Sequence, residues 1–231
     1  MRTSGDTAIG DRFKEFIRYS ELKQLAYKFA ALQQKKMFRT LAVLSFFPGE
    51  GKSLFCAALA MAYAETCRTN VLVVDTTTFQ NKRSLVLKEC FNGSVPEVHV
   101  MSLEELRRAS AGSGQLSSGS RTEKTPALEG VVVREHPANT AITKENDLSL
   151  IKNAAEDRAK QYGLILLDTA PLNAKNKNNV DPLLVAHSSE ASVLVVSQKL
   201  LHAPDLNAYL KDLEDPTLHL VGMISNEEFV P

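Results

Sequence analysis

The loop at residues 45–53, with the sequence SFFPGEGKS, constrains the fold of this chain more than any other segment. It follows a continuous apolar run at residues 40–45 and precedes a helix-forming stretch at residues 53–67. Gly49 and Gly51 allow the backbone to adopt positive φ angles, which turn its N–H groups toward a bound anion. A strand, a glycine-containing turn and a helix N-terminus together predict a phosphate-binding loop.

The residues at the end of this loop have the chemistry that nucleotide binding requires. Lys52 supplies a cation for the β- and γ-phosphates, and Ser53 supplies a hydroxyl ligand for Mg²⁺. We therefore predict a site for a nucleotide's phosphates with these contacts: Pro48, Gly49, Glu50, Gly51, Lys52, Ser53 and Leu54. The full phosphate-loop pattern has glycine where Phe46 stands. The alternative interpretation is an ordinary turn between a strand and a helix.

Apolar runs alternate with helix-forming stretches along most of the chain. The runs are continuous, which indicates strands covered on both faces, as in a parallel sheet. Strands are predicted at residues 40–45, 71–75, 130–133, 164–168, 191–196 and 218–225. Helices are predicted at residues 13–37, 53–67, 147–161, 181–187 and 205–213. This alternation predicts an α/β fold with a doubly wound, mostly parallel sheet.

The length of the chain favours one large domain, because 231 residues compare with about 150 residues for a typical domain. Residues 39–231 are predicted to form the phosphate-loop domain. Residues 1–38 precede its first strand and are predicted to form a helical arm that packs on the domain or on a neighbour. Residues 110–126 are rich in Ser and Gly, which predicts a mobile loop inside the domain.

The composition of the chain argues against several classes of partner and indicates its compartment. Lys plus Arg is 27 and Asp plus Glu is 27, so no net charge attracts the chain to nucleic acid. The three cysteines are too few for a disulfide framework and contain no CxxC pair for zinc. No apolar run approaches the roughly 20 residues that span a bilayer, and the start lacks the apolar core of a signal peptide. We expect a cytoplasmic protein that a partner recruits to the membrane if it works there.

Two carboxylates end predicted strands. Asp168 follows the apolar run at residues 164–167, and Asp75 follows the run at residues 71–74. Ligands bind at the carboxyl ends of strands in such sheets, so Asp168 is predicted to hold Mg²⁺. Asp75 is predicted to orient the metal or to accept a proton from an attacking hydroxyl. The alternative for each residue is a carboxylate that caps the following turn.

Taken together, these motifs resemble those of the bacterial tyrosine kinases of capsule and exopolysaccharide biosynthesis. These are P-loop proteins related to the septum-positioning and chromosome-partitioning ATPases. Residues 45–53 match the family pattern S-x-x-x-G-E-G-K-S/T, and residues 166–171 match its second box, apolar residues followed by D-x-x-P. The resemblance covers residues 40–226. It implies that Lys52, Asp75 and Asp168 are catalytic, that Ser53, Asp75 and Asp168 hold Mg²⁺, and that Asn226 contacts adenine.

The sequence departs from the family pattern at three places. In the extra acidic box D-x-D-x-R, only Asp75 is retained, because Thr77 replaces the second acid and Phe79 the arginine. The oligomer motif E-x-x-R-x-x-R aligns with Glu21, Gln24 and Tyr27, so both arginines are missing. The family's tyrosine-rich tail is also missing from residues 227–231. We therefore expect a monomer or a homodimer in isolation, and weak or lost tyrosine autophosphorylation.

The resemblance implies an ATP-dependent phosphotransferase or ATPase that works with a membrane-bound regulator of polysaccharide chain length or another membrane activator. Two alternatives remain at this point. One is a positioning-type ATPase that hydrolyses ATP to switch partners. The other is a nucleotide-binding regulatory subunit with no catalytic activity.

Overall fold

The computed structural model describes residues 20–77, 96–106, 161–174, 179–197, 210–211 and 213–226. Outside these ranges lie the predicted strand at residues 130–133, the loop at 110–126 and nearly all of the predicted helix at 147–161. The predicted helix at 205–213 is described only at residues 210–211 and 213, which are helical. Among the described residues, no helix is both long enough and apolar enough to cross a membrane.

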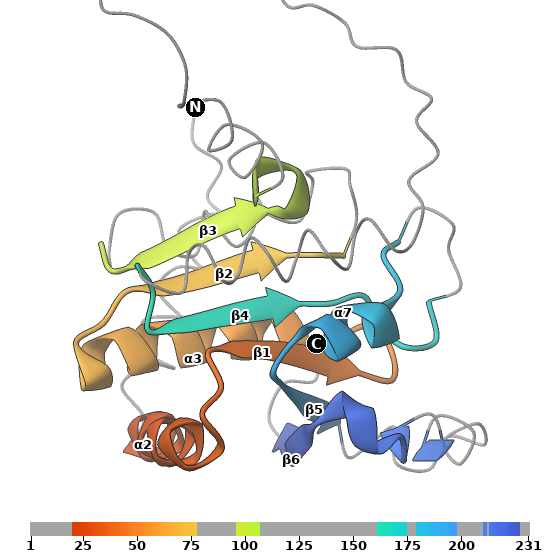
Figure 1. Cartoon of the computed structure of the whole chain (residues 1–231), viewed down its shortest axis with the longest axis horizontal. Helices are drawn as coiled ribbons and strands as arrows, with labels where there is room; N and C mark the ends of the chain where they lie inside the picture. The colour runs from red at the N-terminus through yellow and green to blue at the C-terminus, as the bar shows by residue number, and fades with distance from the viewer. Residues whose placement is uncertain are drawn as a thin grey trace, which may run out of the picture.

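A six-stranded sheet forms the centre of the molecule, and all of its strand pairs are parallel (Figure 1). The strands are β1 (Thr40–Ser45), β2 (Val71–Asp75), β3 (Val98–Ser102), β4 (Leu164–Asp168), β5 (Ala191–Ser197) and β6 (Leu220–Asn226). Their spatial order is β3-β2-β4-β1-β5-β6. The sheet confirms the predicted α/β fold and brings the carboxyl ends of all six strands to one edge.

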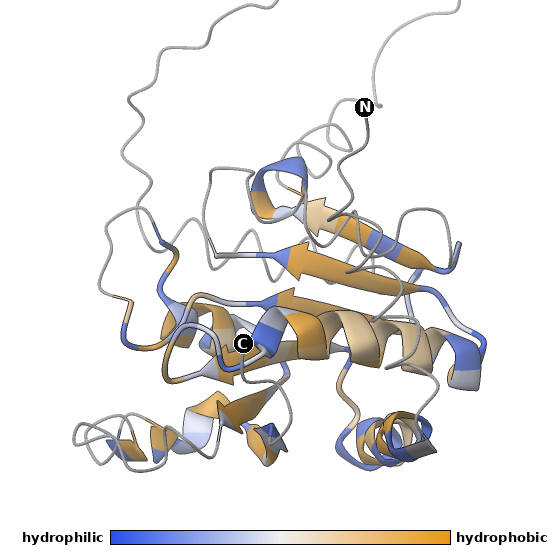
Figure 2. Ribbon diagram, turned by 180° about the vertical axis from the view of Figure 1, so that it is seen from behind, coloured by the Kyte–Doolittle hydropathy of each residue, from blue (hydrophilic) through white to orange (hydrophobic). Residues whose placement is uncertain are grey.

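Helices cover both faces of the sheet. Helix α2 (Ser20–Lys36) and helix α3 (Lys52–Cys67) pack on one face, and the short helix α7 (Pro182–Ser188) packs on the other (Figure 1). Alternate residues of each central strand supply the two cores: Val43 belongs to the core under α3, and Leu44 belongs to the core under α7. Every residue of β1, β2, β4 and β5 is buried, and Figure 2 shows the hydrophobic character of β2 and β4.

The described part of the predicted arm, which contains helix α2, packs against the domain. Leu22, Ala26 and Phe29 of α2 are buried in the same core as α3. The rings of Phe29 and Phe55 lie 6.2 Å apart between their centroids. Of the two placements predicted for the arm, the structure therefore has the arm packed on its own chain.

Strand β3 was not predicted from the sequence. Its residues VHVMS interrupt the apolar run with His99, and three of the five residues are exposed or half-buried. It pairs with β2 and stands at the end of the sheet order. A strand with one neighbour needs no continuous apolar run, which is why the search for such runs missed it. The alternation of Val98 and Val100 was the signal available.

Candidate nucleotide-binding site

The loop between β1 and α3 has the backbone shape that its glycines allow. Gly49 and Gly51 both adopt φ of +86°, a left-handed conformation that costs other residues about 1–2 kcal/mol. Gly51 is the N-cap of α3, and its carbonyl accepts the N–H of Phe55 at 2.8 Å. The free N–H groups of the first turn of a helix attract anions. The loop and the start of α3 therefore form one possible phosphate cradle.

Lys52 and Asp168 form a buried ion pair beside this loop. Nζ of Lys52 lies 3.9 Å from Oδ1 of Asp168, and the two side chains are 6% and 1% exposed. Lys52 comes from the first residue of α3, and Asp168 comes from the last residue of β4. The structure thus brings together two charged residues that the sequence analysis placed in one site.

Asp75 lies beside Asp168 on the neighbouring strand. The two are register partners at the carboxyl ends of β2 and β4. Asp75 is buried, and its Oδ1 accepts the backbone N–H of Thr77 at 3.0 Å and the hydroxyl of Thr77 at 2.6 Å. Thr76 caps the end of β4 in turn, because its N–H and its hydroxyl both donate to the carbonyl of Asp168 at 2.9 Å.

Two chemical features fit this edge of the sheet to a magnesium ion. Ser53, Asp75 and Asp168 offer only oxygen ligands, which Mg²⁺ prefers, and this ion commonly takes one or two carboxylates while it keeps several waters. The side chains at this edge therefore have the donor atoms that suit a nucleotide-bound Mg²⁺.

Glu50 and Asn226 occupy positions that the sequence analysis did not foresee. The carboxylate of Glu50 accepts the N–H of Phe47 at 2.8 Å and the N–H of Ser197 at 3.1 Å. Asn226, at the end of β6, donates from Nδ2 to the carbonyl of Glu50 at 3.0 Å. Both predicted nucleotide contacts are therefore bound to the protein itself in this structure.

The segment after β4 also holds the phosphate loop. The N–H of Leu172 donates to the carbonyl of Ser45 at 2.9 Å, and the N–H of Asn173 donates to the carbonyl of Phe46 at 3.0 Å. The hydroxyl of Thr169 reaches the carbonyl of Val43 at 2.7 Å. These bonds connect β1 and the start of the loop to the D-x-x-P segment and the two residues after it.

Cys56 lies on α3, one turn beyond the loop, and is fully buried. Burial raises the pKa of its thiol well above the usual range, and the charge of Asp168 raises it further, while Lys52 opposes this. A thiol in such surroundings stays protonated and is a poor nucleophile. Cys56 is therefore a packing residue at the base of the site.

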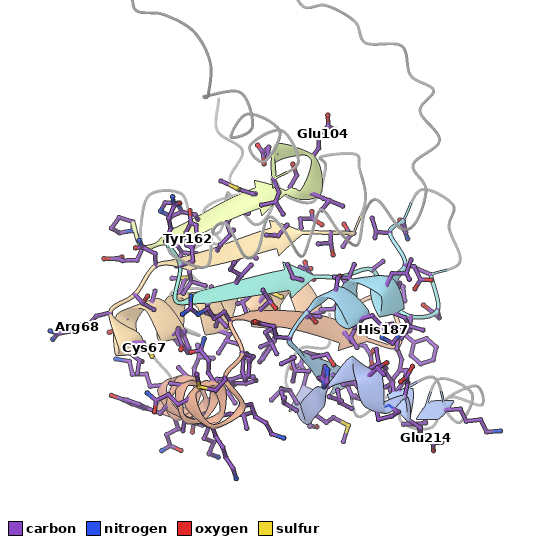
Figure 3. The ribbon with its side chains drawn as sticks, in the orientation of Figure 1. Cys67, Arg68, Glu104, Tyr162, His187 and Glu214 are labelled. Atoms are coloured by element: carbon purple, nitrogen blue, oxygen red, sulfur yellow. The ribbon has the colours of Figure 1, made fainter. Side chains whose placement is uncertain are left out.

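The opposite edge of the sheet carries a different group of side chains. Tyr162 precedes β4, and its hydroxyl lies 2.9 Å from Nδ1 of His99 (Figure 3). The rings meet edge to face at 5.3 Å between centroids. This pair lies at the amino ends of the strands, away from the phosphate loop, and has no part in the candidate site.

The parallel sheet, the glycine loop after β1 and the carboxylates at the ends of β2 and β4 define a P-loop NTPase fold of the α/β class. Comparisons with solved structures agree. The kinase domain of the Escherichia coli tyrosine kinase ETK is similar to this chain, with a TM-score of 0.57 and 18% identity over 91% of this chain and 75% of that one. The BceF tyrosine kinase domain has a TM-score of 0.55 and 18% identity over 89% and 76%.

A third similar structure is the VpsO kinase domain, with a TM-score of 0.52 and 16% identity over 93% of this chain and 98% of that one. No protein-family model and no curated protein matches the sequence. The chain thus has the fold of bacterial tyrosine kinase domains, the group that its motifs resemble, at a low level of sequence identity.

Proposed function

We propose that this chain binds ATP with Mg²⁺ and cleaves the bond to the γ-phosphate, as a tyrosine-kinase-like ATPase of exopolysaccharide or capsule biosynthesis. The observation that supports this best is the buried Lys52–Asp168 pair beside a glycine loop with two left-handed residues. A buried pair of charges next to a helix N-terminus is costly to keep for stability alone. It suits a site where phosphate and a metal ion complete the charge balance.

We assign each residue a role that its chemistry supports. Lys52 neutralises charge that develops on the transferred phosphoryl group. Ser53 and Asp168 hold the metal, which when bound supplies Lewis-acid stabilisation of the phosphate oxygens. Asp75, bonded to Thr77 through one oxygen, orients the metal or accepts the proton of an attacking hydroxyl. Asn226 contacts adenine from the end of β6 with the amide oxygen that its bond to the Glu50 carbonyl does not use.

The test measures ATP turnover by the purified chain through the release of inorganic phosphate. Lys52→Met should abolish turnover, because it removes the cation nearest the phosphates. Lys23→Met is the matched control: Lys23 is half-exposed on α2 and forms an ion pair with Glu65 at 3.2 Å, away from the loop, so this variant should retain wild-type turnover. Wild-type turnover in a folded Lys52→Met protein would overturn the proposal.

A second function, a nucleotide-binding switch without tyrosine phosphorylation, is favoured by the described tyrosines. Tyr63 and Tyr162 are buried, and the exposed Tyr27 lies within a helix. A tyrosine in a packed helix does not reach another active site without local unfolding. The switch would work as an ATPase or as a regulatory subunit, recruited from the cytoplasm by a membrane-bound partner. Mass spectrometry decides between the two functions: stoichiometric phosphotyrosine in the wild type, absent in Lys52→Met, supports the kinase.

A further inference from the structure

Glu50 is an acidic residue inside a loop that is built to hold phosphate. Its side chain is 1% exposed, although its neighbours Pro48 and Gly49 are exposed at the surface of the loop. A carboxylate so close to a polyphosphate repels it, because like charges at short range cost free energy. A favourable interaction of the Glu50 side chain must therefore outweigh this repulsion if the loop is to bind phosphate.

The hydrogen bonds of Glu50 supply that contribution. One carboxylate oxygen accepts the N–H of Phe47, three residues earlier in the same loop, at 2.8 Å. The other accepts the N–H of Ser197, the last residue of β5, at 3.1 Å. Bonds from backbone N–H groups to an ionised carboxylate are among the stronger hydrogen bonds in proteins. A single side chain thus closes the loop on itself and ties it to the neighbouring strand.

We propose that Glu50 is a positioning residue that holds the phosphate loop in its binding shape, and is not a ligand of the nucleotide. This inference rests on the proposed nucleotide binding at the same loop. Glu50 acts through the backbone: it fixes Phe47 at the start of the turn, and its own carbonyl is held by Asn226. The left-handed Gly49 and Gly51 then have no freedom to open the cradle.

Two substitutions separate positioning from simple charge. Glu50→Gln removes the negative charge, but an amide has a single acceptor oxygen, and its NH₂ group would face a backbone N–H. Glu50→Asp keeps the charge, but its side chain is one methylene shorter and cannot span both amides. A positioning role predicts that both variants bind nucleotide more weakly. A role through charge alone predicts tighter binding for Glu50→Gln and unchanged binding for Glu50→Asp.

The experiment measures the Kd for ADP with Mg²⁺ by calorimetry, together with amide hydrogen exchange of the full chain without nucleotide. Losing one charge-assisted bond should raise the Kd about tenfold or more. The amides of Phe47 and Ser197 should exchange faster in both Glu50 variants than in the wild type. Glu65→Gln is the matched control: Glu65 is an exposed carboxylate on α3, so neither its Kd nor these two amides should change.

The inference fails if Glu50→Gln binds ADP as tightly as the wild type or more tightly, or if Phe47 and Ser197 exchange rapidly in the wild type. The exchange rates of these two amides can be measured on the wild-type chain alone, without nucleotide. A wild-type chain that binds no ADP but protects both amides would overturn the proposed function and leave the loop-holding role of Glu50 supported. The two proposals therefore fail by different observations.

Discussion

Thr77 donates two hydrogen bonds to the same carboxylate oxygen of Asp75, one from its backbone N–H at 3.0 Å and one from its hydroxyl at 2.6 Å. Both side chains are buried. The position that holds a second acid in the family pattern therefore holds a donor that fixes the first acid. Asp75 therefore has a defined orientation beside Asp168, and the site has one negative charge fewer than the family pattern gives it.

Replacing this donor by a second acid should make stability depend on the metal. In Thr77→Asp, the hydroxyl bond to Asp75 would be replaced by a second buried carboxylate, and we expect the free energy of unfolding to fall by roughly 2 kcal/mol. A divalent cation would neutralise the pair, so the loss should shrink when Mg²⁺ and ADP are added. Thermal unfolding with and without Mg²⁺·ADP measures both effects.

Thr77→Val is the control for that experiment. It removes the hydroxyl bond without adding a charge, so its loss of stability should not depend on Mg²⁺. An equal response of the Asp and Val variants to the metal would contradict the placement of Asp75 at the metal site.

The two loop glycines should differ in their tolerance of a side chain. Both have φ of +86°, but a Cβ at Gly51 would lie 2.3 Å from Nδ2 of Asn226, whereas one at Gly49 would have nothing within 4 Å. Both alanine variants carry the backbone strain of about 1–2 kcal/mol, and Gly51→Ala adds a steric clash. We expect Gly51→Ala to lower both stability and nucleotide affinity more than Gly49→Ala does.

Shortening the neighbour should relieve the clash. The double variant Gly51→Ala, Asn226→Ala should be less stable than the single Asn226→Ala variant only by the backbone strain of the alanine. Urea unfolding of the wild type, the three single variants and the double variant measures this. Equal losses for Gly49→Ala and Gly51→Ala would show that Asn226 does not constrain the loop.

The Lys52–Asp168 pair should be coupled in stability. Removing either partner leaves a buried charge without its ion partner, so Lys52→Met and Asp168→Asn are each expected to cost roughly 3 kcal/mol of unfolding free energy. The double variant should cost less than the sum of the two. A double-mutant cycle by urea denaturation gives the coupling energy, and strict additivity would argue against a direct interaction.

A surface cluster gives a pH-dependent prediction. The hydroxyl of Thr217 donates to Asp215 at 2.6 Å, its N–H donates at 2.9 Å, and His187 lies 3.8 Å from the same carboxylate. The side-chain bond from Thr217 is the largest of the causes that lower the pKa of Asp215. Since this pKa is lower in the folded state, the stabilisation is present above the ordinary pKa of the carboxyl and is lost as the pH falls through the lowered value.

Thr217→Val should therefore raise the pKa of Asp215, as an NMR titration of its carboxyl carbon would show. The variant should be less stable than the wild type at neutral pH, and the difference should vanish in acid. A difference that stays constant down to acidic pH would mean that the bond to the ionised carboxylate is not its source.

The exposed residues of α2 predict the oligomeric state of the isolated chain. The exposed side of α2 carries Glu21, Gln24 and Tyr27. These residues align with the oligomer motif of the family, which has arginines at the positions of Gln24 and Tyr27. Neither glutamine nor tyrosine forms the bidentate, permanently charged contact of arginine. Light scattering should show a monomer or a dimer, and the variant Gln24→Arg, Tyr27→Arg should form larger assemblies. A stable closed ring of the wild-type chain alone would contradict this.

Local sequence was sufficient for the strands that are covered on both faces. The predicted ranges at 40–45, 71–75 and 164–168 coincide with β1, β2 and β4, because a buried parallel strand requires a continuous apolar run. The sequence analysis placed Asp75 and Asp168 at the carboxyl ends of two strands, and the register of β2 and β4 makes them direct neighbours. Strand β3 was missed because it lies at the end of the sheet and its side chains are partly exposed.

The interactions around the loop could not be predicted in the same way. The loop motif predicts Glu50 as a nucleotide contact, and no local pattern predicts the bond of its carboxylate to Ser197, which is 147 residues away in sequence. Likewise, the bond between Asn226 and the carbonyl of Glu50 spans 176 residues. No local pattern encodes such a partner, since it depends on which strand ends the sheet order brings together.

The sheet order also has a consequence for how the protein is made. Strand β1 pairs only with β4 and β5, and both are translated after residue 163. Until then, a nascent chain carries an apolar β1 whose two edges have no partner, and unpaired strand edges are prone to association with other chains. The ribosome therefore releases the phosphate loop long before the strands that support it, and chaperone binding during synthesis would be concentrated on the first third of the chain.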